Sequence, residues 1–180
     1  MRVAVYRITD QPYTLQDVCP GEDFPVLRSW AKAREGRITA PLNISLILRR
    51  TGKLIEVSGR LQTRLELVCR RCLNSYDWPL SFDCRFYCAP QSEAESTLKL
   101  KKEMELDGED IGHYEYSGEE LDLRQAIGEE VLAALPAYPL CRPDCRGLCP
   151  HCGAAIQDQP CTCNRPDTDP RWTALAKLKK

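Results

Sequence analysis

Eight of the eleven cysteines in this 180-residue chain lie in close pairs, a spacing typical of metal ligands. The clearest pair is in Cys149-Pro150-His151-Cys152-Gly153, because Cys-x-x-Cys on a tight turn presents two thiolates to one ion. Gly153 can adopt the positive φ that such a knuckle requires. Zinc prefers four soft ligands at tetrahedral angles, so a second pair has to come from nearby. The segment from Cys141 to Cys163 therefore predicts a structural zinc site.

The other two ligands of this site stay open on spacing alone. A ribbon-like arrangement favours the pair that follows the knuckle, Cys161 and Cys163, and the pair that precedes it, Cys141 and Cys145, is the alternative. A mixed set fits the spacing equally well: Cys145, Cys149, Cys152 and Cys163. All six cysteines of the segment are candidate ligands, and the two of the knuckle rank first.

A second possible metal pair is Cys69 and Cys72, in Cys69-Arg70-Arg71-Cys72. A redox Cys-x-x-Cys should open a helix whose N-terminus lowers a thiol pKa, but here a turn and a strand are expected to follow, which disfavours thioredoxin-like chemistry. The pair needs two partner ligands, and the thiols suffice for two four-cysteine sites or for one site with spares. Cys84 and Cys88 fall on the apolar face of a predicted strand and are interpreted as core residues, and Cys19 is isolated.

Groups that could act in catalysis are scarce in this sequence. His113 and His151 are the two histidines, so a Ser/His or Cys/His system has few candidate bases. Neither a phosphate-binding Gly-x4-Gly-Lys loop nor a dinucleotide-binding Gly-x-Gly-x-x-Gly motif occurs. A zinc ion closed by four thiolates has no open position for a substrate. These features favour a binding or assembly factor over an enzyme.

The composition is that of a globular protein, with 43% hydrophobic and 28% charged residues. The N-terminus has no long apolar segment, and no run of about 18 apolar residues is present to span a membrane. The odd number of cysteines also argues against a secreted disulfide scaffold. We therefore expect a cytoplasmic protein without a membrane partner. Its net charge of −1 is uneven, because residues 91–122 hold eleven acidic residues and three lysines while the rest is mildly basic.

Apolar residues that alternate with polar ones predict three strands, at residues 42–49, 55–69 and 78–88. The second is long for a strand, and Gly59 is a candidate for a bulge or bend within it. Together the three strands predict an antiparallel meander, to which residues 2–8 can add a fourth. The predicted fold class is α+β, with an antiparallel, barrel-like sheet as the body, a C-terminal zinc-binding knuckle and short flanking helices.

The predicted body, residues 1–136, includes an acidic loop at about 91–118 and a helix at about 122–135. Asp122 and Gln125 fit a capping box at the start of this helix, and Pro136 ends it.

The remaining residues, 137–180, are expected to form a cysteine-rich zinc module that closes with a short helix. Asp169 suits the N-cap of that helix, and Pro170 suits its first position.

Several of these segments together resemble one known family. A Cys-x-Arg-Cys-Leu segment, Cys69 to Leu73, follows a long strand, and a predicted helix ends in Glu130-Val131-Leu132-Ala133-Ala134-Leu135-Pro136. The cysteine segment from Leu140 to Gly153 comes next, and Asp169-Pro170-Arg171-Trp172 stands near the C-terminus. The set closely resembles the YceD family of bacterial and plastid proteins, described as large-subunit ribosomal RNA accumulation proteins, and the resemblance covers nearly the whole chain.

This resemblance implies a role in the accumulation, processing or assembly of large-subunit (23S) ribosomal RNA, with RNA or ribosomal precursors as partners and no known catalytic activity. An RNA-binding role predicts arginines that contact phosphates, first Arg70 and Arg71 and next Arg142 and Arg146. The alternative is a zinc-containing protein-interaction adaptor without direct RNA binding, whose acidic segment would suit basic ribosomal proteins.

Overall fold

In the computed structural model, which describes residues 1–33, 36–91, 113–156 and 161–163, the alternating segments form the centre of a six-stranded sheet. Its strands follow the order β2-β4-β5-β6-β7, and β3 also pairs with β5. The strands are β2 (Tyr13–Cys19), β3 (Gly36–Ile38), β4 (Leu42–Thr51), β5 (Leu54–Val68), β6 (Ser75–Pro90) and β7 (His113–Tyr116). Pairing is antiparallel for β2 with β4, β4 with β5 and β3 with β5, and parallel for β6 with β7.

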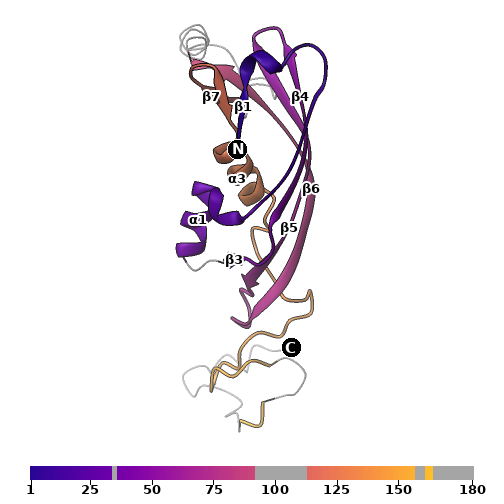
Figure 1. Cartoon of the computed structure of the whole chain (residues 1–180). Helices are drawn as coiled ribbons and strands as arrows, with labels where there is room; N and C mark the ends of the chain where they lie inside the picture. Colours follow the sequence, from indigo (N-terminus) through magenta and orange to yellow (C-terminus); the bar gives the residue numbers. More distant parts are fainter. Residues whose placement is uncertain (34–35, 92–112, 157–160, 164–180) are drawn as a thin grey trace, which may run out of the picture. The chain divides into compact units, whose positions relative to one another are not determined.

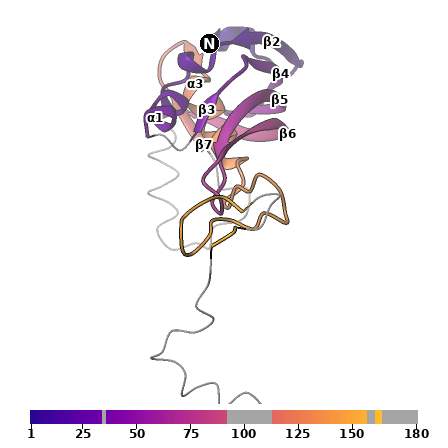
Figure 2. The same ribbon diagram turned by 90° about the horizontal axis from the view of Figure 1, so that it is seen from below.

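The predicted α+β class and mostly antiparallel sheet are confirmed, but the barrel-like closure is wrong. The path of paired strands ends at β2 on one side and β7 on the other, so the sheet stays open. Its apolar face is covered by two helices, α1 (Pro25–Lys32) and α3 (Arg124–Ala133), which lie side by side against it (Figures 1 and 2). Helices that bury the apolar side chains of a sheet remove the need for the sheet to close on itself.

The alternation in the sequence matches the two faces of the sheet. In β4, four apolar side chains from Leu42 to Leu48 are at most 1% exposed, and the residues between them are exposed. Leu61 and Leu65 of β5 are fully buried on the same face, together with Leu27 of α1 and Ile127 of α3. This continuous apolar cluster is the main source of stability for this part of the chain.

Gly59, the candidate for a bulge or a bend, forms no bulge. The register between β4 and β5 runs without interruption from the Thr51–Leu54 pair to the Asn43–Gln62 pair. A Cβ atom at Gly59 would lie 2.1 Å from the carbonyl oxygen of Ser45, so this position needs glycine because the backbone of β4 approaches too closely for a side chain.

The predicted fourth strand of the meander is also wrong. β1 (Arg2–Ala4) stops at a 3-10 helix over Val5–Arg7 and pairs with β8 (Glu120–Asp122) in a separate two-stranded antiparallel sheet. A further 3-10 helix, Gly21–Asp23, comes before α1. Since β1 and β8 are far apart in sequence, local alternation carried no information on their pairing.

Helix α3 lies within the predicted range, but the predicted capping box is wrong. The Asp122 carboxylate accepts hydrogen bonds from the backbone N–H and guanidinium of Arg124, and the Gln125 amide donates to Glu129 at 3.0 Å. The N-cap is Leu123, without a side-chain hydrogen bond. Part of the predicted acidic loop is strand β7, residues 92–112 of that loop lie outside the described residues, and so does the predicted terminal helix.

The chain divides into two compact units. The body unit comprises Met1–Leu67 and Tyr76–Pro139, and the cysteine unit comprises Val68–Ser75 and Leu140–Lys180. The cysteine unit thus takes the connection between β5 and β6 together with the C-terminal segment. No helix within the described residues has the length and apolar character needed to cross a membrane.

Candidate metal centres

The cysteine unit gathers eight thiols into two groups of four, with the Sγ atoms of each group within 4.8 Å of one another. We call them the first and the second centre. The first centre contains Cys69, Cys72, Cys141 and Cys145. The second centre contains Cys149, Cys152, Cys161 and Cys163. Each of the four sequence-local pairs thus enters one group intact, and the two Cys-x-x-Cys turns go to different groups.

The separations between sulfur atoms fit a tetrahedral ion. Metal–sulfur bonds of about 2.3 Å at tetrahedral angles place the sulfur atoms about 3.8 Å apart. In the first centre, the Sγ atoms of Cys69 and Cys145 are 3.8 Å apart, and those of Cys72 and Cys141 are 3.7 Å apart. In the second centre, the Sγ atoms of Cys152 and Cys161 are 3.4 Å apart. A disulfide would require about 2.0 Å, and all of these cysteines are free thiols.

The first centre joins the turn after β5 to the segment that starts at Cys141. The turn is closed by two backbone hydrogen bonds, from Cys69 N–H to Asn74 at 3.0 Å and from Leu73 N–H to Cys69 at 2.9 Å. The Arg71 guanidinium donates to the carbonyl oxygen of Cys145 at 2.9 Å and to that of Pro143 at 3.3 Å. Arg71 therefore ties together the two segments that supply the four thiols of the first centre.

The second centre is built on a knuckle of the same kind. Gly153 N–H donates to the carbonyl oxygen of Cys149 at 2.9 Å, which is the same bond that Leu73 makes to Cys69. Cys149 N–H donates to Ala154 at 2.7 Å, and the backbone N–H of His151 lies 3.4 Å from the Cys149 sulfur. Backbone N–H groups that point at sulfur stabilise a thiolate, which is the form that binds a metal.

The residue after each knuckle adopts a left-handed backbone conformation. Gly153 has a φ of 72°, and Leu73 has a φ of 60°. For a residue with a side chain this conformation costs roughly 1–2 kcal/mol, whereas glycine adopts it freely. Two identical turns thus carry different residues at the position where glycine is favoured.

The pKa values show how far these thiols depend on a cation. Backbone hydrogen bonds outweigh burial and lower the pKa of Cys69 to about 6, and hydrogen bonds from Cys152 and His151 N–H lower that of Cys149 to about 6. Burial and the neighbouring Cys69 thiolate raise the pKa of Cys141 to about 12. Cys161 and Cys152 raise the pKa of Cys163 to about 12.

Four converging thiols therefore cannot all ionise by themselves, and a cation bound between them would allow it. A set of four thiolates suits a soft ion that accepts tetrahedral geometry, as in zinc or iron–sulfur sites. The donor set and the sulfur separations thus both fit a metal centre that is closed to substrate.

The two centres differ in exposure. Cys69, Cys72 and Cys145 of the first are buried and Cys141 is half-buried. In the second, Cys149 is buried, Cys161 and Cys163 are half-buried and Cys152 is exposed. The first centre is therefore better shielded from water and small molecules.

The four arginines expected to contact RNA all belong to the cysteine unit, in different environments. Arg70, Arg71 and Arg146 are exposed, and Arg142 is half-buried. Arg71 is engaged by the carbonyl oxygens next to the first centre, and the Arg142 Nε atom lies 3.5 Å from the Asp144 carboxylate. Arg70 and Arg146 are thus the better placed of the four to meet a partner.

The three cysteines outside the two centres belong to the body unit. Cys84 and Cys88 are buried in the apolar core, as expected, and burial raises the pKa of Cys84 to about 11 and that of Cys88 to about 12. Cys19 is half-buried and belongs to neither four-cysteine group. Neutral thiols in an apolar core are packing residues.

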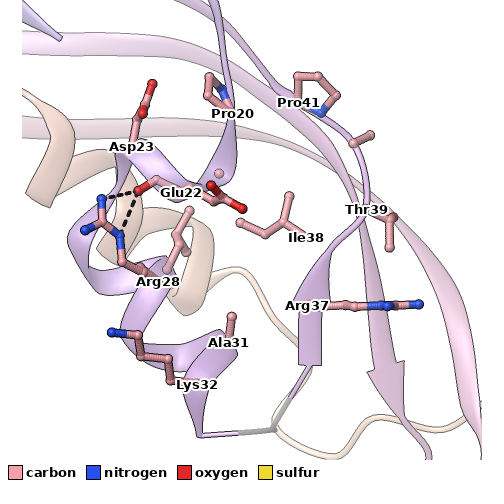
Figure 3. Close-up of a pocket in the computed structure, with 13 residues that line it drawn as sticks. Pro20, Glu22, Asp23, Arg28, Ala31, Lys32, Arg37, Ile38, Thr39 and Pro41 are labelled. Atoms are coloured by element: carbon pink, nitrogen blue, oxygen red, sulfur yellow. Dashed lines mark hydrogen bonds between the residues drawn. The ribbon is translucent and has the colours of Figure 1, made fainter.

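A hollow of about 720 Å³ lies in the body unit between α1, the preceding 3-10 helix and β3. It is lined by side chains of both charge signs, and the Arg28 guanidinium turns back to the carbonyl oxygen of Glu22 (Figure 3). Such a mixed, open lining does not select one class of ligand.

The chain matches the family model described as "Large ribosomal RNA subunit accumulation protein YceD" over residues 57–179. An uncharacterised protein of Mycobacterium tuberculosis is 28% identical over 140 residues, which cover 77% of this chain and 62% of the relative. The chloroplastic large ribosomal RNA subunit accumulation protein YCED homolog 1 of Arabidopsis thaliana is 23% identical over 157 residues, covering 78% of this chain and 49% of the relative. This chain thus spans about half to three fifths of the length of these relatives. No solved structure matches it.

Proposed function

Because the chain belongs to the YceD family of large ribosomal RNA subunit accumulation proteins, we propose that it is a non-catalytic factor for accumulation, processing or assembly of large-subunit (23S) ribosomal RNA. It acts by binding this RNA or its precursor particles in the cytoplasm. The observation that carries the proposal is the extent of the family match, which begins in β5 and includes both four-cysteine centres. The part of the chain with the most distinctive chemistry is thus the part shared with the family.

Zinc is the proposed occupant of both centres, and its role is structural. Every buried hydrophobic residue in the described part of the cysteine unit is a cysteine: Cys69, Cys72, Cys145 and Cys149. A segment without an apolar core needs another source of folding free energy, and metal–thiolate bonds supply it. Zinc bound by four thiolates keeps no open position, which agrees with a non-catalytic role.

Direct RNA contact is assigned to the cysteine unit because its described residues include four arginines and one acidic residue, Asp144. A zinc ion with four thiolates is itself a dianion, so part of this positive charge offsets the centres. Arg71 is placed for that task, since it bonds the carbonyl oxygens of Pro143 and Cys145, whereas Arg142 lies beside the Asp144 carboxylate. Arg70 and Arg146 are exposed and can contact phosphates.

The polar face of the sheet is a weaker candidate for RNA, since four of its arginines are paired with acids across strands. The Arg60 guanidinium lies 2.8 Å from the Asp83 carboxylate, and the Arg64 guanidinium lies 2.6 Å from the Asp77 carboxylate. A third pair, Arg85 with Glu56, joins the same two strands, and a fourth, Arg37 with Glu66, joins β3 to β5. Charges neutralised in this way attract phosphate less than an arginine without an acid nearby.

This paired face is the observation that favours the second candidate, an adaptor that contacts ribosomal proteins without touching RNA. Alternating positive and negative side chains suit a polar protein surface, on which each charge finds an opposite partner.

The test measures binding of the zinc-loaded protein to a 23S precursor transcript over a range of salt concentrations. A double variant, Arg70→Ala with Arg146→Ala, should bind more weakly and reduce the slope of log K against log salt by about 1–2. Arg60→Ala is the matched control, and its slope should stay that of the wild type. Binding only to precursor particles that contain protein, and not to the transcript, would replace RNA contact with the adaptor.

A further inference from the structure

Leu73 combines two features that the turn itself does not need. It is the one non-glycine residue with positive φ within the described ranges, and its side chain is 62% exposed. Large apolar side chains normally gain stability by burial, and backbone strain at such a position is normally relieved by glycine. Leu73 is strained and gains little from burial.

The second knuckle shows that glycine suffices for this turn. Gly153 makes the same hydrogen bond to the first cysteine of its knuckle, at the same 2.9 Å and with nearly the same φ. The leucine side chain therefore contributes nothing that the turn or the thiol geometry requires. Strain at an exposed position of this kind points to contact with a partner.

We propose that Leu73 and Arg70 form one contact surface for an unpaired segment of RNA, in which Leu73 packs on the face of an unstacked base and Arg70 binds a neighbouring phosphate. The inference rests on the proposed function and deepens it by naming the form of RNA. Bases in loops and bulges offer flat apolar faces to proteins, and leucine side chains pack against unstacked bases in other nucleic-acid complexes.

Charge and position favour RNA over an apolar pocket of a protein. The segment Val68–Ser75 carries two arginines and no acidic residue, so an apolar tip is flanked by positive charge. Both Arg70 and Leu73 are exposed on a turn of six residues. A partner that offers apolar faces next to regularly spaced negative charges is a single-stranded nucleic acid.

The turn is also rigid enough to present a side chain. Two backbone hydrogen bonds close it, Arg71 bonds it to Pro143 and Cys145, and two of its cysteines are ligands of the first centre. A contact residue held in place before binding loses little conformational entropy on binding.

Leu73→Gly in the zinc-loaded full chain tests the proposal. The variant should keep its zinc content and thermal stability, since glycine relieves strain. Its affinity for a single-stranded loop from the 23S precursor should fall about five- to tenfold, with an unchanged salt slope, because the lost contact is not electrostatic. Leu73→Met restores an apolar side chain and should recover most of the affinity, whereas Arg70→Ala should lower the slope by about 1.

Three outcomes overturn the proposal, and they are distinguishable. If the wild type binds the loop and Leu73→Gly binds it equally well, the leucine contact is wrong while the proposed function stands. If Leu73→Gly loses affinity only for protein-containing precursor particles, the partner is a protein pocket. If the wild type binds no RNA at all, direct RNA contact is wrong, and the adaptor takes the place of the RNA-binding factor.

Discussion

The body unit and the cysteine unit bury different kinds of side chain. The body unit buries aliphatic and aromatic side chains from the sheet and both helices in one cluster. In the cysteine unit, the buried hydrophobic residues among those described are all cysteines, gathered around two centres. One unit thus obtains its stability from apolar burial, and in the other the proposed metal ligation takes that role.

The cysteines themselves show the difference best, because one residue type behaves in opposite ways. Burial among apolar side chains raises the pKa of Cys88 to about 12, so this thiol stays neutral. Hydrogen bonds from backbone N–H groups lower the pKa of Cys69 to about 6, although the residue is fully buried. Burial alone therefore does not tell a packed thiol from a ligand, whereas the donors and thiols around it do.

Removal of zinc should give the largest effect and separate the two units. Structural zinc contributes about 10–16 kcal/mol in small metal-dependent domains. A strong chelator at neutral pH should therefore abolish amide protection in the turn Val68–Ser75 and in Leu140–Ile156, while the core of β4 and β5 stays protected. Hydrogen exchange followed by mass spectrometry measures both in one sample.

The matched variants for this experiment are Cys72→Ser and Cys19→Ser. Native mass spectrometry should find two zinc ions per chain in the wild type, one in Cys72→Ser and two in Cys19→Ser. A single ion in the wild type, or a cysteine unit that keeps its protection after chelation, would contradict the comparison.

A cavity in the apolar core should affect the body unit alone. Leu61 of β5 is fully buried, so Leu61→Ala should lower the free energy of unfolding by about 2–5 kcal/mol in urea. The neighbouring Gln62 lies on the opposite, exposed face, and Gln62→Ala should change stability by less than about 1 kcal/mol. Zinc content should stay that of the wild type in both variants, and loss of zinc in Leu61→Ala would show that the units do not fold independently.

Local signals were sufficient to predict the centre of the sheet and helix α3. The segments of alternating apolar and polar residues between Leu42 and Cys88 form β4, β5 and β6. In and just before α3, the apolar residues Leu123, Ile127 and Val131, spaced four apart, are all buried. Such periodicity arises because one face of the strand or helix is buried, so it can be read from the local sequence.

Long-range pairing could not be predicted in the same way. No residue of β2 is buried, and the half-buried residues on one of its faces give only a weak alternation of apolar and polar residues. β1 pairs with β8, a strand more than a hundred residues away in the sequence. The grouping of Cys141 and Cys145 with the turn after β5 is another long-range contact. Sequence spacing left open a mixed set that splits two of the four pairs, and it did not show which pairs converge, because a metal ion selects ligands by distance in space.

An exchange of the residue at the left-handed position should give an intermediate effect. Gly153 has φ 72° with no atom within 4 Å of an added Cβ, so Gly153→Ala adds conformational strain without a clash. The expected cost is roughly 1–2 kcal/mol, seen as an approximately 5- to 30-fold loss of zinc affinity at the second centre in a competition with a chelating dye.

Gly52, in the turn between β4 and β5, is a control of the same geometry in the body unit. Its φ is 62°, and again no atom lies within 4 Å of an added Cβ. Gly52→Ala should cost a similar amount in urea unfolding of the body unit and leave zinc affinity unchanged. Equal zinc affinity in Gly153→Ala and the wild type would mean that ligation does not depend on the shape of the knuckle.

The smallest effect is expected from charges in the body unit, which only supplement its apolar core. Hydrogen bonds from Arg124 lower the pKa of Asp122 to about 2, below its ordinary value. A carboxyl whose pKa is lower in the folded than in the unfolded protein stabilises the fold at pH values above the unfolded pKa, and this contribution is lost as the pH falls toward 2.

Asp122 is 37% exposed, so Asp122→Asn should cost less than about 1 kcal/mol at neutral pH. The difference from the wild type should shrink as the pH falls through 2. In an Arg124→Ala background Asp122→Asn should have a smaller effect, because Arg2, whose Nε lies 3.5 Å from the Asp122 carboxylate, remains as its partner. A cost that is equal at pH 2 and at neutral pH, or equal with and without Arg124, would assign Asp122 a role in packing instead of charge.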